Sequence, residues 1–124
     1  MKIIGHPWIK SEEFYRVIDI EDIKKTPPNS TILLSTFNID IVLFCQKNLL
    51  PLAVEIESIK DAIFSNLLEV KYIVCSKELA KEIIPIAENY LFDTQLLAKI
   101  SEDSEIEDMA KIGVDGVIYF FKIK

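Results

Sequence analysis

From residue 31 onward, short apolar runs recur at a spacing of about 20 residues, with longer mixed segments between them. Each run is apolar at successive positions rather than at alternate ones. This pattern is typical of parallel strands that are covered on both faces. It predicts strands at TILLST (31–36), PLAVEI (51–56), KYIVCS (71–76), QLLAKI (95–100) and GVIYFF (116–121).

The segments between these runs predict helices with recognisable ends. Asn38 or Thr36 is placed to cap the first helix, and Ser58 to cap the second. Pro85 lies inside the third, where it removes a backbone hydrogen bond, so we expect a kink or a break. The three predicted helices are IDIVLFCQKN (39–48), IKDAIFSNLLE (59–69) and KELAKEIIPIAENYL (77–91).

A fourth helix is predicted before the last strand. Ser104 and Glu107 have the spacing of a capping box, and Gly113 is placed as a left-handed stop. The segment from Gly113 to Gly116 then enters its strand from the amino end. In parallel α/β sheets ligands bind beyond the carboxyl ends, so we interpret this segment as a turn rather than a site.

The first 30 residues are less regular. FYRVID (14–19) is predicted to be another strand, IEDIKK (20–25) a short helix, and the Pro27-Pro28 pair a stiff connection. No linker, charge block or low-complexity segment divides the chain. Residues 1–124 are therefore expected to form a single domain.

Alternating strands and helices predict the α/β class, with right-handed crossovers and a predominantly parallel sheet of five or six strands. With helices on both faces, this would be an open doubly wound sheet, flavodoxin-like in outline. The alternative is a partial β/α barrel, because a complete barrel needs about 250 residues.

Composition excludes some classes of binding partner. The net charge of −6 and a single arginine, Arg16, argue against nucleic acid, which needs clustered cations. No apolar run approaches the roughly 18 to 20 residues of a membrane span, and the first residues do not resemble a signal peptide. We therefore expect a cytoplasmic protein with no membrane partner. Cys45 and Cys75 are expected to be free buried thiols.

Several chemical templates are missing. The only glycines are Gly5, Gly113 and Gly116, which make no glycine-rich phosphate loop and no dinucleotide fingerprint. His6 is the only histidine, so a catalytic triad would depend on it alone. No ligand spacing predicts a metal site. We expect neither a cofactor nor a metal.

Candidate site residues are those at the predicted carboxyl ends of the strands, where one crevice would collect them. Glu55 and Lys99 stand out because each lies late in an apolar strand, where a charge needs a partner. If they approach one another, they form either a buried ion pair or a proton-transfer site, with Glu55 as base and Lys99 stabilising an oxyanion. Weaker ligand-binding candidates, which are also natural helix caps, are Ser35, Asn38, Glu57, Ser58, Ser76 and Ser101.

The stretch LLAKISEDSEIEDMAKIGVDGVIYF (96–120) resembles the later β/α units of barrel enzymes such as the keto-acid aldolases and the glycerophosphodiester phosphodiesterases. The aldolase resemblance implies a Schiff-base lysine within the last strand, but Lys122 comes only after it. The phosphodiesterase resemblance implies an early His-Arg and a Glu-x-Asp site, and neither is present. The chain is assigned to neither family.

Three functions follow from these observations. The first is a non-catalytic domain that binds a protein or a small ligand and forms homo-oligomers, since 50% of the residues are apolar and no catalytic set is complete. The second is a small lyase- or aldolase-like enzyme that uses Glu55 and Lys99. The third is a receiver-like phosphate sensor, for which Asp19, Glu21 and Asp22 are a poor match to the required acidic pair.

Overall fold

A computed structural model describes residues 1–124. It contains one sheet whose seven strands are all parallel, in the order β1-β7-β6-β5-β4-β3-β2. The prediction of five or six strands is wrong, because it missed the short first strand, β1. The three residues of β1 give too weak a pattern to detect. The strands are β1 (Lys2–Ile4), β2 (Phe14–Val17), β3 (Thr31–Leu34), β4 (Leu52–Glu55), β5 (Tyr72–Cys75), β6 (Gln95–Ile100) and β7 (Gly116–Tyr119).

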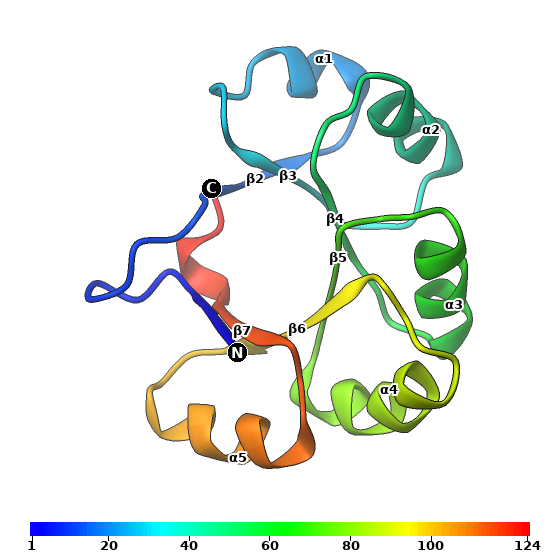
Figure 1. Cartoon of the computed structure of the whole chain (residues 1–124). Helices are drawn as coiled ribbons and strands as arrows, with labels where there is room; N and C mark the ends of the chain where they lie inside the picture. Colours follow the sequence, from blue (N-terminus) through cyan, green and yellow to red (C-terminus); the bar gives the residue numbers. More distant parts are fainter.

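The sheet is curled, and the helices lie around its outside (Figure 1). The strands from β2 to β7 are neighbours in sequence order, so successive crossovers of the same hand place the five α-helices on one face. The prediction of helices on both faces is therefore wrong, and the strand order is that of the partial barrel.

No helix combines the length and the apolar character needed to cross a membrane. The helices are α1 (Ile20–Lys24), α2 (Ile39–Lys47), α3 (Ile59–Leu67), α4 (Lys77–Asn89), α5 (Ser104–Ile112) and the 3-10 turn η1 (Phe120–Lys122).

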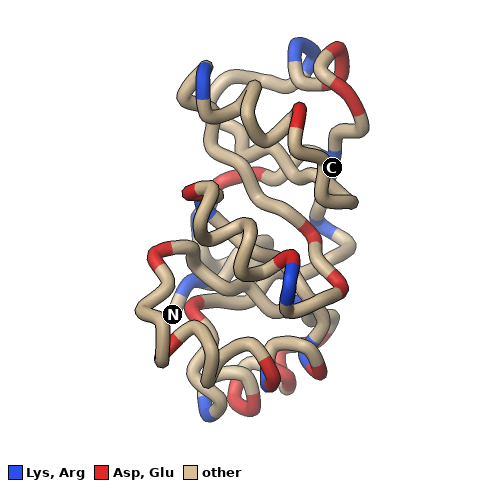
Figure 2. The backbone as a smooth tube through the Cα atoms, turned by 90° about the vertical axis from the view of Figure 1, so that its right-hand side faces the viewer, with Lys and Arg blue, Asp and Glu red and all other residues tan.

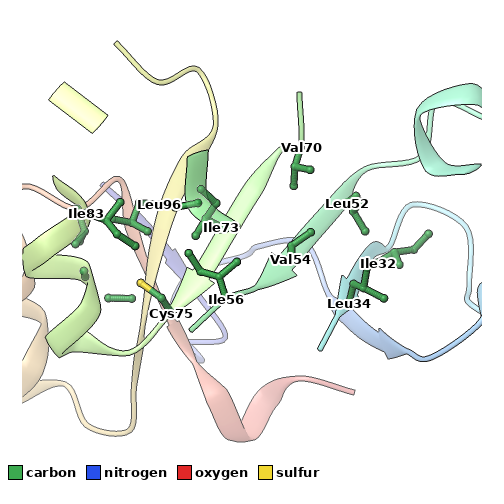
Figure 3. Close-up of a cluster of buried hydrophobic side chains, with 14 of the residues drawn as sticks. Ile32, Leu34, Leu52, Val54, Ile56, Val70, Ile73, Cys75, Ile83 and Leu96 are labelled. Atoms are coloured by element: carbon green, nitrogen blue, oxygen red, sulfur yellow. The ribbon is translucent and has the colours of Figure 1, made fainter. Parts of the chain in front are cut away.

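Curling explains why the strands are apolar on both faces. The outer faces pack against the helices, as Val54, Ile73 and helical Ile83 illustrate (Figure 3). The inner faces pack against one another and include no helical residue. An inner core of strand side chains therefore replaces the second helix layer. Its buried members are Ile4, Phe14, Leu33, Ala53, Tyr72, Val74, Leu97 and Ile118.

Four helices end in the same turn. In α2, α3 and α4 the residue after the C-cap takes a left-handed φ, and in α5 the C-cap Gly113 itself does; its N–H donates to a carbonyl three residues earlier. The next residue is apolar, and its N–H donates to a carbonyl five residues earlier. These are the features of a Schellman motif. The left-handed residues are Leu49 (φ 54°), Glu69 (φ 60°), Leu91 (φ 52°) and Gly113 (φ 90°).

Gly113 ends α5 in the left-handed conformation that the sequence predicted. It leads into the amino end of β7, where the Asp115 side chain accepts a hydrogen bond from the Leu96 N–H at 2.7 Å. Gly116 then faces the interior of the ring. A Cβ at this position would lie 2.7 Å from the Lys2 carbonyl oxygen, so close packing requires glycine.

The predicted helix starts hold for three helices. Asn38, Ser58 and Ser76 accept backbone N–H groups at the starts of α2, α3 and α4. The capping box predicted for Ser104 and Glu107 is wrong, because Ser104 already lies inside α5 and the carboxylate of Glu105 accepts the N–H groups before it. The helix α4 runs through Pro85 without a break.

The ring is interrupted between β1 and β2, which do not pair with each other. Residues 5–13 connect these two strands without a helix, and the C-terminal residues run across the same gap (Figure 1). There the backbone N–H of Lys124 donates to the carbonyl of Phe14 at 2.8 Å. We call this gap the seam.

Candidate functional site

Glu55 and Lys99 lie on the same side of the sheet. Glu55 is in register with Val74, and Lys99 is in register with Ile118. Residues in register on neighbouring parallel strands share a face, and Val74 and Ile118 both belong to the inner core. Both charged side chains therefore face the interior, at the carboxyl ends of their strands.

The two side chains make direct contact, and a third charge joins them. The Lys99 Nζ donates to Glu55 Oε2 at 2.8 Å. The Arg16 Nη1 donates to Glu55 Oε1 at 2.7 Å, and also to the Ser35 hydroxyl at 2.7 Å. Arg16 is in register with inner-core Leu33 and therefore reaches the interior from β2. We call Arg16, Ser35, Glu55 and Lys99 the oxyanion cluster.

The cluster is partly open to solvent. The side chain of Glu55 is 17% exposed, while those of Lys99 and Arg16 are 31% and 41% exposed. Burial alone raises the pKa of Glu55, but the hydrogen bonds and positive charges of Lys99 and Arg16 outweigh it and hold this pKa below 4.5. Glu55 is thus an ionised carboxylate shared by two cations.

Several donors of the cluster have no protein partner. All hydrogen bonds from Arg16 leave from Nη1, so Nη2 and Nε are uncommitted. The ammonium of Lys99 has three donors and uses one of them, for Glu55. The two cations and one carboxylate leave a net charge of +1. The cluster can therefore bind a further anionic oxygen.

The remaining predicted site residues divide between caps and surface positions. Asn38, Ser58 and Ser76 have their side chains committed as the helix caps described above. The hydroxyl of Ser101 contacts the carboxylate of Glu105 at 3.3 Å. Glu57 is exposed and makes no hydrogen bond. Of the hydroxyl candidates, only Ser35 belongs to the oxyanion cluster.

Sequence reasoning missed a second group of side chains at the carboxyl ends. His6 follows β1, and its Nε2 lies 3.2 Å from Asp103 Oδ2. Its Nδ1 accepts the Trp8 N–H at 3.1 Å, and the Tyr119 hydroxyl donates to Asp103. Burial and the Asp103 carboxylate raise the pKa of Tyr119 to about 12. Both nitrogens of His6 are occupied, so this group fixes the loop after β1.

The amino end of the ring holds another polar network, which the sequence also did not reveal. Glu12 accepts hydrogen bonds from Thr31 at 2.6 Å and from Tyr72 at 2.5 Å. Lys2 donates to the Tyr72 hydroxyl at 2.6 Å, and Lys71 lies 3.5 Å from Glu12. Burial raises the pKa of Glu12, but these hydrogen bonds and the two lysines outweigh it and lower the pKa overall. The network closes the end opposite the oxyanion cluster.

The cysteines agree with the prediction of free buried thiols. Cys45 and Cys75 are unpaired and buried. Burial raises the pKa of the Cys45 thiol to about 11 and that of Cys75 to about 12. Neither is a nucleophile at neutral pH. No three His, Cys, Asp or Glu side chains converge in a group that could hold a metal ion.

The surface carries mixed charge and many apolar side chains. Basic and acidic residues are interspersed on the face seen in Figure 2. The aromatic residues Phe14 and Tyr119 are buried. The apolar residues that are at least half exposed are Met1, Trp8, Ile18, Leu49, Leu67, Tyr90, Leu91, Phe120 and Phe121.

Two comparisons with known proteins found no related protein. No protein-family model matches the chain. No curated protein matches its sequence. The geometry of the side chains is therefore the basis for a functional proposal.

Proposed function

We propose that the protein is a non-catalytic α/β domain that binds a small oxyanion, a carboxylate or a phosphate, at the oxyanion cluster. The observation that carries this proposal is the set of uncommitted donors on Arg16 and Lys99, which face the interior at the carboxyl end of the sheet. This is the end at which parallel α/β folds bind their ligands.

The charges of the cluster support an anionic ligand. Arg16 offers a planar fork that matches carboxylate and phosphate oxygens, and Lys99 adds a mobile ammonium. Glu55 balances one of the two charges and holds both cations in place while the site is empty. The lowered pKa of Glu55 favours this positioning role, because a carboxylate that stays ionised is a weak base.

The proposal is tested by titrating the protein with inorganic phosphate and with succinate, followed by amide chemical shifts and thermal stability. We expect saturable shifts around residues 16, 55 and 99. At a ligand concentration of about 100 times the Kd, binding stabilises the fold by roughly 2.7 kcal/mol. Arg16→Gln and Lys99→Gln should each weaken binding at least tenfold.

Lys60→Gln is the matched control, because Lys60 lies on the exposed face of α3 and makes no ion pair. It removes the same charge from the whole protein and should leave binding unchanged. Equal weakening of binding in the Lys60 and Lys99 variants would mean that the net charge of the protein, and not the cluster, controls the affinity. The absence of saturable shifts near the cluster would refute the proposal.

We further propose that the protein associates with copies of itself through exposed apolar side chains. Leu43 on α2 and Phe64 and Leu67 on α3 are each 47% exposed or more, on successive helices on the outside of the ring. Monomeric proteins rarely keep large apolar patches in contact with water. Sedimentation velocity tests this, with Phe64→Glu expected to shift the protein to monomer. A wild-type protein that stays monomeric at millimolar concentration would refute it.

The second candidate function is the lyase- or aldolase-like enzyme. The contact of 2.8 Å between Lys99 and Glu55 favours it, because acid-base partners need to be within hydrogen-bond reach. Exchange of the C3 protons of pyruvate in D2O, followed by NMR, tests it. Exchange that is lost in both Glu55→Gln and Lys99→Met would favour the enzyme. Binding without exchange would favour the non-catalytic proposal.

A further inference from the structure

The seam between β1 and β2 contains a cavity of about 380 Å³ that is separate from the oxyanion cluster. Part of its lining is buried inner core, namely Ile4, Phe14 and Ile118, each at most 4% exposed. The rest comes from residues 5–13 and from the C-terminal residues 122–124. Its volume lies in the usual range for small-molecule sites, about 300 to 1,000 Å³.

The loop that walls this cavity is held by its own hydrogen bonds. The Gly5 N–H donates to the Ser11 hydroxyl at 3.2 Å, and the Trp8 N–H donates to His6 Nδ1 at 3.1 Å. His6 is in turn fixed by Asp103 of the α5 start, at 3.2 Å. Gly5 has a left-handed φ of 96°, and a Cβ there would lie 3.0 Å from Lys122. The wall is therefore formed before any ligand arrives.

Both acidic side chains that line the cavity have partners within the chain, whereas two of its lysines have none. Glu12 is engaged in the amino-end network, and Glu13 pairs with Lys124 at 3.0 Å. Lys10 and Lys122 also line the cavity, but neither makes an ion pair or a hydrogen bond within the chain. The unbalanced charge at the seam is therefore positive, although the whole protein is acidic.

We propose that the seam cavity binds a small monocarboxylate with an apolar body. The apolar body packs against Pro7, Ile9 and Ile123, the lining residues that keep exposed apolar surface, and the carboxylate pairs with Lys10 and Lys122. Each lysine ammonium is a point charge without the planar fork of arginine. The two oxygens of one carboxylate can therefore pair with both ammonium groups. This inference stands apart from the proposed function, because it uses none of the oxyanion cluster.

Amide chemical shifts during titration with phenylacetate test the proposal, with neutral 2-phenylacetamide as the matched ligand. We expect saturable shifts at Gly5, Ile118 and the neighbouring seam residues. Phenylacetate should bind at least tenfold more tightly than the amide. The double variant Lys10→Gln/Lys122→Gln should remove that preference and leave the binding of the amide unchanged, whereas Lys60→Gln should leave both affinities unchanged.

Three results would overturn the proposal. They are equal affinities for phenylacetate and the amide, shifts that bypass the seam, and the absence of saturation by both phenylacetate and octanoate at millimolar concentration. The lysine variants change exposed side chains, and circular dichroism with thermal melting verifies that they remain folded. Phosphate shifts around residues 16 and 99 are read from a separate titration, so the seam site and the oxyanion cluster can fail independently.

Discussion

Leu49 and Leu91 occupy backbone positions that suit glycine. Both follow the C-cap of a helix in the left-handed region, with φ of 54° and 52°, while the equivalent residue after α5 is Gly113. The two residues are 91% and 82% exposed, so packing within the chain offsets little of this strain. We predict that Leu49→Gly and Leu91→Gly each stabilise the protein.

The size of the effect follows from two opposing contributions. A residue with a Cβ pays about 1 to 2 kcal/mol in the left-handed conformation. Glycine loses about 0.5 to 1 kcal/mol because its unfolded chain is more flexible. The difference between the midpoints of these ranges is a net gain of about 0.7 kcal/mol at each site. The turns after α2 and α4 share no hydrogen bond, so the double variant should gain about 1 to 2 kcal/mol.

Urea unfolding and differential scanning calorimetry measure the change. For a chain of 124 residues, 1 kcal/mol corresponds to a Tm shift of about 3 to 5 °C, so the double variant should melt about 3 to 10 °C higher. Leu49→Ala is the matched control, since it removes the side chain and keeps the Cβ. Gly113→Ala is the reverse change and should destabilise the protein by about 1 kcal/mol.

The comparison between glycine and alanine decides the interpretation. If Leu49→Ala stabilises as much as Leu49→Gly, the gain comes from removing an exposed leucine and the backbone argument is wrong. If both variants instead destabilise the protein and reduce self-association, Leu49 is covered in an oligomer. The concentration dependence of Tm separates that case from unfolding of the monomer.

Three further predictions concern the interior of the ring. Gly116→Ala should destabilise the protein by about 1 to 3 kcal/mol in urea, because its Cβ would lie 2.7 Å from the Lys2 carbonyl and 2.8 Å from Leu97. Tyr72→Phe should cost about 1 to 3 kcal/mol in the same assay, since it leaves Lys2 and Glu12 without their shared partner. The pKa of Glu12 is lower in the folded protein than its ordinary 4.5, so its stabilisation is present above pH 4.5 and is lost as the pH falls through the folded value. Glu12→Gln should therefore flatten the loss of stability in acid, and an unchanged acid profile would contradict this.

The strands were predictable because their cause is local. Runs such as TILLST and KYIVCS are apolar on both faces, and this pattern correctly predicted parallel strands β3 and β5. The pattern does not state what covers each face, because a second helix layer and an inner core demand the same residues. The small inner residues Ala53 and Gly116 are the sequence signal of close packing within a ring. That signal is too weak to use without the register.

The site was predictable only where a charge stood out. Glu55 and Lys99 each interrupt an apolar strand, which marked them as candidates, and the structure places them in contact at 2.8 Å. Arg16 was recognised only as the single arginine, because the first 30 residues gave no register to place it on the inner face. The Glu12 network depends on contacts across 59 and 60 residues of chain, to Lys71 and Tyr72. No local pattern encodes such a distance.

The two polar ends of the ring differ in a way that bears on function. At the amino end, Tyr72 both donates and accepts, and Glu12 accepts from two hydroxyls, so these two side chains are satisfied within the chain, while Lys2 and Lys71 keep donors for solvent. The amino end has no arginine, so it lacks the planar fork that matches a carboxylate or a phosphate. At the carboxyl end, Arg16 and Lys99 keep donors that the chain does not satisfy. These donors must bond to water or to a ligand, which is the physical reason to seek the binding function at that end.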